Sequence, residues 1–181
     1  AVRLRVERLR LLRSLMTRDS MTGLYNHSTT TDLITKTLSQ AHREENQHAM
    51  AMIDIDHFKQ VNDTHGHLAG DQVIITLARL LKSRLRLSDI IGRYGGEEFV
   101  VLLKGVSGEQ AARLIESLRE DFALVDFHAG DVRFRCTFSA GVSSFPEQPS
   151  TESLRLSSDQ ALYRAKELGR NQVSTELADE F

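Results

Sequence analysis

The chain lacks several features that would place it in other classes of protein. Its 181 residues include one cysteine, Cys136, so an internal disulfide framework is excluded, and the thiol is expected to be buried in a strand. No apolar run approaches the length needed to cross a bilayer, and the first residues show no signal-peptide pattern. These absences predict a cytoplasmic location, while a membrane anchor elsewhere in a longer protein stays open.

An excess of charge of either sign is also missing. The net charge of −2 gives no reason to expect nucleic-acid binding. With 40% hydrophobic and 27% charged residues, the composition is that of an ordinary globular protein, and 181 residues fit one domain with a substantial core. The function therefore has to be sought in motifs rather than in composition.

Residues 1–18 differ from the rest of the chain. Apolar residues recur there at spacings of three and four, which predicts an amphipathic helix: Val2, Val6, Leu9, Leu12 and Met16. This segment contains six arginines and only one acidic residue, Glu7, so the helix could lie on a membrane or a partner. We favour the end of a coiled-coil linker from an N-terminal sensory domain, and we expect the chain to be a fragment of a longer protein.

Residues 19–181 alternate between strand and helix patterns. Helices are expected over 31–43, 57–63, 73–85, 109–124 and 157–168, and strands over 49–55, 90–94, 98–103, 131–136 and 138–145. Gly66 and Gly70 are expected to break the chain before the third of these helices, and 173–177 is a candidate last strand. The alternation predicts an α/β fold in which helices cover a central sheet.

The segment GRYGGEEFVVLL at 92–103 is the most informative one. Apolar residues on both sides of Gly95 and Gly96 predict a buried hairpin that turns at the two glycines. A large ligand can approach bare backbone there, and Glu97 and Glu98 lie at the mouth of the turn. Adjacent acids in this place suit a divalent metal, or a phosphate held through one; the alternative is a solvated acidic tip.

A second acidic segment, AMAMIDID at 49–56, strengthens the metal interpretation. Period-two alternation puts Asp54 and Asp56 on the same side of a buried strand. A strand end and a hairpin tip that are both acidic form a plausible hard-cation site for magnesium or manganese, between which the sequence does not choose. For Asp56 the alternative is preferred, namely the N-cap of the helix that begins with HFKQVND.

Four motifs in order resemble the GGDEF family, the diguanylate cyclases of bacterial signalling. They are RDSMTGLYN at 18–26, DIDHFKQVNDTHGHLAGD at 54–71, RLSDIIGRYGGEEF at 86–99 in the Glu-Glu variant, and DQALYRAKELGRN at 159–171. The resemblance covers the chain from about Arg18 to Asn171. One departure is His27, where the family more often has arginine, and no chemistry is assigned to that position.

The resemblance implies both a fold and a reaction. The fold is a central, mainly antiparallel five-stranded sheet flanked by helices in a βααββαβ-like order, akin to class III nucleotidyl cyclases and polymerase palm domains. The reaction joins two GTP molecules into cyclic di-GMP and releases two pyrophosphates, with each 3′-hydroxyl attacking the other nucleotide's α-phosphorus. Because one GTP cannot cyclise alone, a homodimer is expected.

The resemblance also implies the residues that carry the chemistry. Asp54, the Ile55 backbone carbonyl and Glu97 are the expected metal ligands, with Glu98 a secondary candidate. Glu97 is also the proposed general base, and Lys59 is the expected transition-state-stabilising lysine.

Substrate binding is assigned in the same way. Asn62 and Asp71 match the guanine-binding positions, since N1 and N2 of guanine both donate to an acceptor. His67 is a candidate for the ribose, with packing of the turn as its alternative, and Phe58 is counted with the substrate site. The alternative for Asn62 and Asp71 is turn and helix-capping chemistry around the nearby glycines.

Two cations in the last motif are expected to bind the β- and γ-phosphates. Lys166 and Arg170 are four residues apart, which predicts that they share one helix face. Their alternative is the ordinary complement of a helix C-terminus by positive charge.

Arg86 and Asp89 form an RxxD sequence that matches the family's inhibitory product site. Arginine can pair bidentately with O6 and N7 of guanine. A second arginine is expected from the helix at 109–124, where Arg113 and Arg119 are both candidates. The alternative is a solvated salt bridge in a loop.

These observations leave three functions in competition. The first is an active, product-inhibited diguanylate cyclase, with a cyclase that makes a mixed or adenine product as a variant. The second is a non-catalytic receptor for cyclic di-GMP, which the presence of Asp54, Lys59, Glu97 and Glu98 disfavours. The third is a structural output domain that docks through its basic helix.

Overall fold

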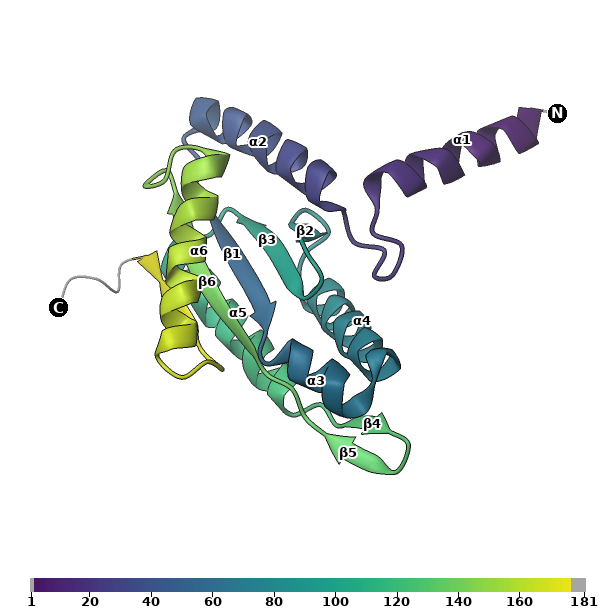
Figure 1. Ribbon diagram of the computed structural model, residues 1–181. Coiled ribbons are helices and arrows are strands. Elements are labelled where there is room, and N and C mark those ends of the chain that lie inside the picture. The colour runs from purple at the N-terminus through teal and green to yellow at the C-terminus, as the bar shows by residue number, and fades with distance from the viewer. Residues whose placement is uncertain (1, 177–181) are drawn as a thin grey trace.

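The computed structural model describes residues 2–176 and forms a sheet with helices on both faces (Figure 1). Leu177, the end of the predicted last strand, lies outside this range. The helices are α1 Val2–Thr17, α2 His27–Glu44, α3 Phe58–His65, α4 His67–Arg84, α5 Gly108–Ala123 and α6 Thr151–Glu167. The strands are β1 His48–Ile55, β2 Ile90–Arg93, β3 Glu98–Lys104, β4 Phe127–Ala129, β5 Val132–Phe134, β6 Phe138–Phe145 and β7 Val173–Thr175.

The central sheet has five strands in the order β2-β3-β1-β6-β7. Three of its four pairings are antiparallel, and only β6 and β7 run parallel. The predicted mainly antiparallel, five-stranded α/β fold is therefore confirmed. Strands β1 and β6 are buried along their whole length, since helices cover both faces of the sheet.

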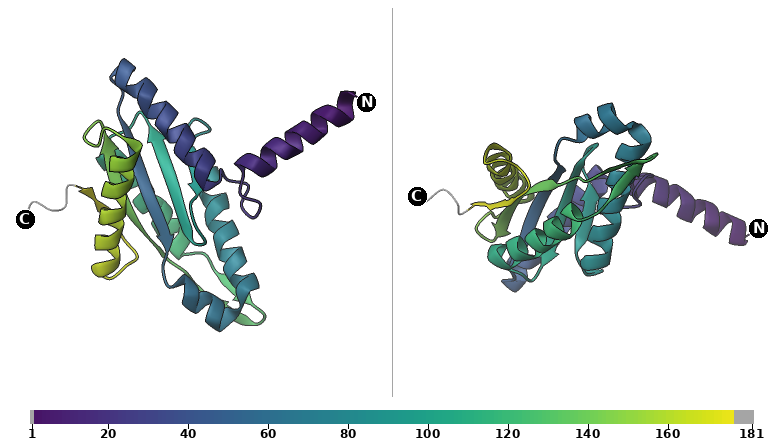
Figure 2. Two further views of the ribbon diagram at one scale, coloured as in Figure 1. Left: turned by 45° about the horizontal axis from the view of Figure 1, so that its top comes forward. Right: turned by 90° about the horizontal axis from the view of Figure 1, so that it is seen from below.

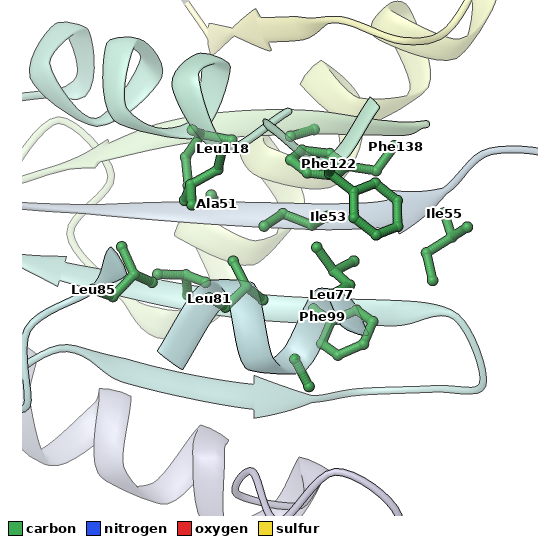
Figure 3. Close-up of a cluster of buried hydrophobic side chains, with 14 of the residues drawn as sticks. Ala51, Ile53, Ile55, Leu77, Leu81, Leu85, Phe99, Leu118, Phe122 and Phe138 are labelled. Atoms are coloured by element: carbon green, nitrogen blue, oxygen red, sulfur yellow. The ribbon is translucent and has the colours of Figure 1, made fainter. Parts of the chain in front are cut away.

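The alternation of side chains along β1 divides the core into two layers. Ile53 and Ile55 belong to the larger cluster, which α4 and α5 cover (Figure 3). Met50 and Met52 point the other way, into a second cluster with residues of α2 and α6. Asp54 follows in the even-numbered series, so it faces the side of the sheet that α6 covers (Figure 2).

Two local predictions were wrong. Helix α4 begins at His67 and runs through Gly70, which does not interrupt it. Gly70 is instead a point of close approach, because a Cβ atom there would lie 1.9 Å from Oδ1 of Asn62. Cys136 is buried as predicted, but it lies between β5 and β6 rather than within a strand, and burial raises the pKa of its thiol to about 11.

The predicted N-terminal helix is present and projects away from the rest of the domain (Figure 1). Apolar side chains along it are exposed, including Leu9 at 61% and Met16 at 76%. This exposure leaves α1 with an apolar surface that its own domain does not cover. In the part of the chain that the structure describes, no helix is both long and apolar enough to span a membrane.

Candidate active site

The site is built around the end of β1, where Asp54 is a buried carboxylate with 8% of its surface exposed. In the sheet register Asp54 lies opposite Glu98 on β3 and opposite Ser139 on β6. Residues directly opposite each other in a sheet project from the same face. The structure therefore brings together two of the predicted acids, Asp54 and Glu98, on the face that α6 covers.

The hairpin is tied to the end of β1 through backbone. The Ile55 amide donates to the Glu97 carbonyl at 3.2 Å, and the Tyr94 amide donates across the turn to the Glu98 carbonyl at 2.8 Å. A side chain at Gly95 would begin 2.8 Å from a carboxylate oxygen of the exposed Glu98, which would have to move aside. Glu97 is half-buried and Glu98 is exposed, so both acids stand at an open edge.

A cation from α6 completes this cluster. The Lys166 ammonium lies 3.1 Å from Oδ2 of Asp54 and comes from the last turn of the helix. Burial raises the pKa of Asp54 to about 6; Lys166 opposes this shift, while the charges of Glu97 and Glu98 add to it. A carboxylate this close to other acids gains from any added positive charge.

The donor atoms around Asp54 suit a hard cation. Among the described residues, no three His, Cys, Asp or Glu side chains already gather as a ready-made site. The donors at hand are nevertheless the hard oxygens of Asp54, Glu97 and Glu98, and Asp54 already attracts the ammonium of Lys166. The residues therefore fit a hard divalent cation. The Ile55 side chain is buried as expected, and ligation by its carbonyl stays a prediction.

Helices α3 and α4 bring the predicted substrate-binding residues together. Both Asn62 and Phe58 on α3 approach Gly70 on α4. A Cβ atom added at Gly70 would lie 1.9 Å from Oδ1 of Asn62 and 3.2 Å from Cζ of Phe58. Asp71 follows Gly70 and is half-buried. Neither Asn62 nor Asp71 is the N-cap of α4, a position that Gly66 occupies, so that alternative loses support.

The two remaining polar residues of this region are exposed. Lys59 lies in the first turn of α3, and His67 is the first residue of α4. Both are open to an incoming ligand.

The predicted shared helix face of Lys166 and Arg170 was wrong. Helix α6 ends at Glu167, Gly169 has a φ of 114°, and Arg170 has a left-handed φ of 63°. Glycine after a helix commonly ends it in this way. Arg170 therefore lies in the loop beyond α6, exposed, while Lys166 alone belongs to the helix.

Asp56 is not the N-cap of α3 as predicted, since His57 occupies that position without a side-chain cap. Its carboxylate accepts hydrogen bonds from the hydroxyl groups of Thr137 and Ser139, both at 2.7 Å, and from the Asn171 amide at 3.0 Å. Asp56 thus fixes the loop after α6 against β6. Its partners lie more than 80 residues away in the sequence, which is why a local pattern could not find them.

Another pair that the sequence analysis did not assign holds the hairpin from outside. The Arg93 guanidinium contacts Oδ1 of Asp19 at 3.1 Å and donates to the carbonyls of Gly95 and Gly96, the latter at 2.8 Å. Burial raises the pKa of Asp19, but hydrogen bonds from Thr22 and the Arg93 charge outweigh burial and lower it below its usual value. The motif at 18–26 thereby supports the glycine turn.

Comparison with known proteins decides which family combines these features. The family described as "Diguanylate cyclase, GGDEF domain" matches residues 16–172. The chain belongs to this GGDEF family. Among curated proteins it is 42% identical over 155 residues to the diguanylate cyclase DgcP of Pseudomonas aeruginosa, a match that covers 86% of this chain and 23% of that protein. The chain spans less than half the length of this relative and of the probable diguanylate cyclase DgcC of Escherichia coli.

Solved GGDEF domains share the fold. The coiled coil and GGDEF domain of DgcB from Caulobacter crescentus, solved in complex with c-di-GMP, superimposes with a TM-score of 0.89 at 30% identity and covers 96% of this chain and 92% of its own. The active GGEEF domain of a Vibrio cholerae diguanylate cyclase gives a TM-score of 0.79 at 34% identity, and the match covers 83% of this chain and 96% of that domain. This GGDEF domain, too, has the Glu-Glu form of the signature at 95–99.

The predicted inhibitory pair of this GGDEF domain lies in the turn between α4 and β2. Asp89 accepts hydrogen bonds from the Arg86 amide at 3.0 Å and the Lys104 amide at 3.1 Å. Within residues 2–176, the exposed Arg86 guanidinium has no ion pair, so the alternative of a loop salt bridge is not supported. The candidate second arginines are engaged elsewhere: Arg113 pairs with Glu109 and Arg119 with Glu116.

Proposed function

We propose that this GGDEF domain condenses two GTP molecules into cyclic di-GMP with release of two pyrophosphates. The observation that carries the proposal is the meeting of Asp54, Glu98 and Lys166 at the end of β1, beside the glycine turn. Carboxylates that can bind a metal lie there next to an ammonium group that can bind a phosphate. A phosphoryl-transfer site needs both kinds of group in the same place.

Asp54, Glu97 and the Ile55 carbonyl would hold the metal, with Glu98 as a further ligand. Such an ion, magnesium or manganese, neutralises the triphosphate and lowers the pKa of the attacking 3′-hydroxyl when bound. Support comes from the raised pKa of Asp54, since burial and neighbouring acids make this carboxylate gain from added positive charge.

The other residues of the chain bind and orient the substrate. Asn62 and Asp71 accept the guanine edge, with Phe58 beside it and His67 near the ribose. This division of roles is supported by the approach of Asn62 and Phe58 to Gly70, which holds α3 against α4 at one point.

Charge on the phosphates is met by three cations. Lys59 approaches from the first turn of α3, and Lys166 and Arg170 approach from the end of α6 and the loop beyond it. Glu97 accepts the proton of the 3′-hydroxyl. Metal ligation and proton acceptance both draw on the carboxylate of Glu97, and its two oxygens carry enough lone pairs for the two roles.

Two copies of the domain act together. Each copy holds one GTP, and cyclisation requires the two sites to face each other in a homodimer. The exposed apolar side chains of α1 support pairing through this helix, as does the likeness to a domain solved with its coiled coil. An N-terminal sensory domain preceding α1 and a cytoplasmic location stay predictions.

Product inhibition through Arg86 and Asp89 is the second part of the proposal. Asp89 fixes the turn through two backbone amides, and the Arg86 guanidinium is left exposed for a ligand. Arg86 and Gly95 lie at opposite ends of β2, so the inhibitory and catalytic sites do not share residues.

Incubation of the protein with GTP or ATP and Mg²⁺, followed by chromatography, tests the proposal. Cyclic di-GMP as the product from GTP alone is the expected result. Binding of cyclic di-GMP without any turnover would indicate the receptor function instead. If the protein shows no turnover and does not bind cyclic di-GMP, only a structural role is left. A cyclic dinucleotide that contains adenine would indicate relaxed base recognition.

A further inference from the structure

A cavity of about 340 Å³ lies beside the proposed inhibitory pair. Arg86 and Asp89 form part of its lining, and the rest comes from the loop after α1, the end of α4, the turn after α4 and β2. Two further cations line the cavity: Arg18, which opens the motif at 18–26 but has no role assigned to it, and Lys82, which lies outside the four motifs. The volume is at the lower end of the range for small-molecule sites, which suits one half of a dinucleotide rather than the whole.

We infer that Arg18 and Lys82 are additional ligands of cyclic di-GMP in this cavity, so that product contacts the chain at the junction between α1 and the catalytic domain. The inference rests on the proposed inhibitory site and extends it by two residues. It assigns them a phosphate- and purine-binding role.

Charge supports the assignment. The cavity is lined by three cationic side chains, Arg18, Lys82 and Arg86, and by one carboxylate, Asp89, which leaves a formal charge of +2. Cyclic di-GMP carries two phosphodiester groups, each with one negative charge. The positively charged cavity therefore favours an anionic dinucleotide, of which it holds one half, over a neutral ligand.

The two cations are placed by different contacts. The Arg18 guanidinium lies 3.9 Å from the centre of the Tyr25 ring and donates to the Gly23 carbonyl. A planar guanidinium stacked on one ring has a second face, which can stack on a purine. Lys82 donates to the Thr22 carbonyl at 3.0 Å, and as an ammonium it retains further donors for a phosphate.

Position links this site to the linker helix. Arg18 immediately follows Thr17, the last residue of α1. On the other side, Tyr25 bonds to β2 through the Ile91 carbonyl and the Arg93 amide. A ligand held by both Arg18 and Arg86 would bridge the base of α1 and the loop that leads to the glycine hairpin.

Calorimetric titration with cyclic di-GMP tests the inference on five proteins: wild type, Arg18→Ala, Lys82→Met, Arg86→Ala and the control Arg79→Ala. Arg79 is exposed on α4, one turn from Lys82, and does not line the cavity. We expect each cavity variant to bind about tenfold more weakly or worse, because each loses a charge-assisted contact. Arg79→Ala should stay within about twofold.

The outcomes separate this inference from the proposed function. Weaker binding in Arg86→Ala, with wild-type affinity in Arg18→Ala or in Lys82→Met, would overturn the inference and leave the inhibitory site in place. Unchanged affinity in Arg86→Ala would remove that site altogether. An equal loss in Arg79→Ala would show a general effect of charge, which also overturns the inference.

Loss of fold is checked independently. Lys82→Met keeps the length and apolar stem of the side chain, and Lys82→Arg keeps the charge and should restore binding. Circular dichroism of each free protein should be unchanged. Failure of Lys82→Arg to restore affinity in a folded protein would contradict a ligand role for the charge.

Discussion

The Lys166 ammonium lies 3.1 Å from Oδ2 of Asp54, so a helix end supplies a cation to the carboxylate proposed as a metal ligand. If Asp54 holds the metal as proposed, Lys166 competes with that metal for the carboxylate when no substrate is bound. With GTP bound, the same group is available to the phosphates. One side chain thus joins the two halves of the proposed site.

Replacement of Lys166 by methionine should separate these two effects. The metal concentration for half-maximal activity should fall, because a competing charge is gone, while the KM for GTP should rise about tenfold with the loss of a charge-assisted contact. Steady-state kinetics over a range of Mg²⁺ concentrations measures both. Lys36→Met, on an exposed position of α2, is the matched control. A KM equal to that of wild type would argue against the phosphate role.

The raised pKa of Asp54 makes a prediction about stability. Burial raises this pKa from 3.8 to about 6, so the folded protein binds more protons than the unfolded chain over that interval. Stability should then fall as pH rises from about 4 to 6 and stay low above it, by roughly 1–3 kcal/mol. Replacement of Asp54 by asparagine would remove this electrostatic cost, but it would also remove the ion pair with Lys166, which offsets about 0.2–1 kcal/mol of the gain in stability.

Asp54→Asn should accordingly be more stable than wild type at pH 7.5 in EDTA, and its stability should depend less on pH between 4 and 6. Urea unfolding at pH 4.5 and 7.5 measures the difference. A variant that is less stable at pH 7.5, with the same pH dependence as wild type, would contradict the electrostatic account of this carboxylate.

Gly70→Ala should impair substrate binding rather than folding. Alanine favours the helix by about 1 kcal/mol, but its Cβ atom would begin 1.9 Å from Oδ1 of Asn62 and force that side chain to move. We expect the KM for GTP to rise about tenfold, with the melting temperature little changed. In an Asn62→Ala background, Gly70→Ala should have little further effect on KM. Additive effects would mean that Gly70 acts through another group.

Turnover should depend on protein concentration, since two domains must meet. Specific activity should fall on dilution, and Leu9→Gln should lower it about tenfold at a fixed low concentration by removing apolar surface from α1. Arg5→Gln, exposed on the same helix, serves as the control. Constant specific activity of a protein that sedimentation shows to be monomeric would exclude the dimer.

The sequence predicted those parts of the fold that follow from local patterns. The apolar run of β1 predicted a buried strand that Asp54 closes, and the apolar residues around Gly95 and Gly96 predicted the hairpin, which the structure places next to β1. Both depend on periodicity and turn chemistry, which short segments carry. The resemblance to the GGDEF family joined these segments into one site.

Contacts between distant residues were beyond such patterns. Asp56 was expected to cap the helix that follows it, since its hydroxyl partners, Thr137 and Ser139, are remote in the sequence. Arg93 was not linked to Asp19, 74 residues away. Arg170 was assigned to a helix face because its spacing from Lys166 fits one, although Gly169 ends the regular backbone before it. Asp56 and Arg93 thus depend on tertiary contacts, whereas for Arg170 the local signal of Gly169 was overlooked.

The most direct test of the central claim, that Asp54 and Glu97 hold the metal of a GTP-condensing site, compares three variants for cyclic di-GMP formation. Asp54→Asn and Glu97→Gln should each lose activity by more than about a thousandfold while keeping the wild-type circular dichroism spectrum. Asp63→Asn, an exposed carboxylate on α3, should retain it. More than a few per cent of wild-type activity in both Asp54→Asn and Glu97→Gln would contradict the account.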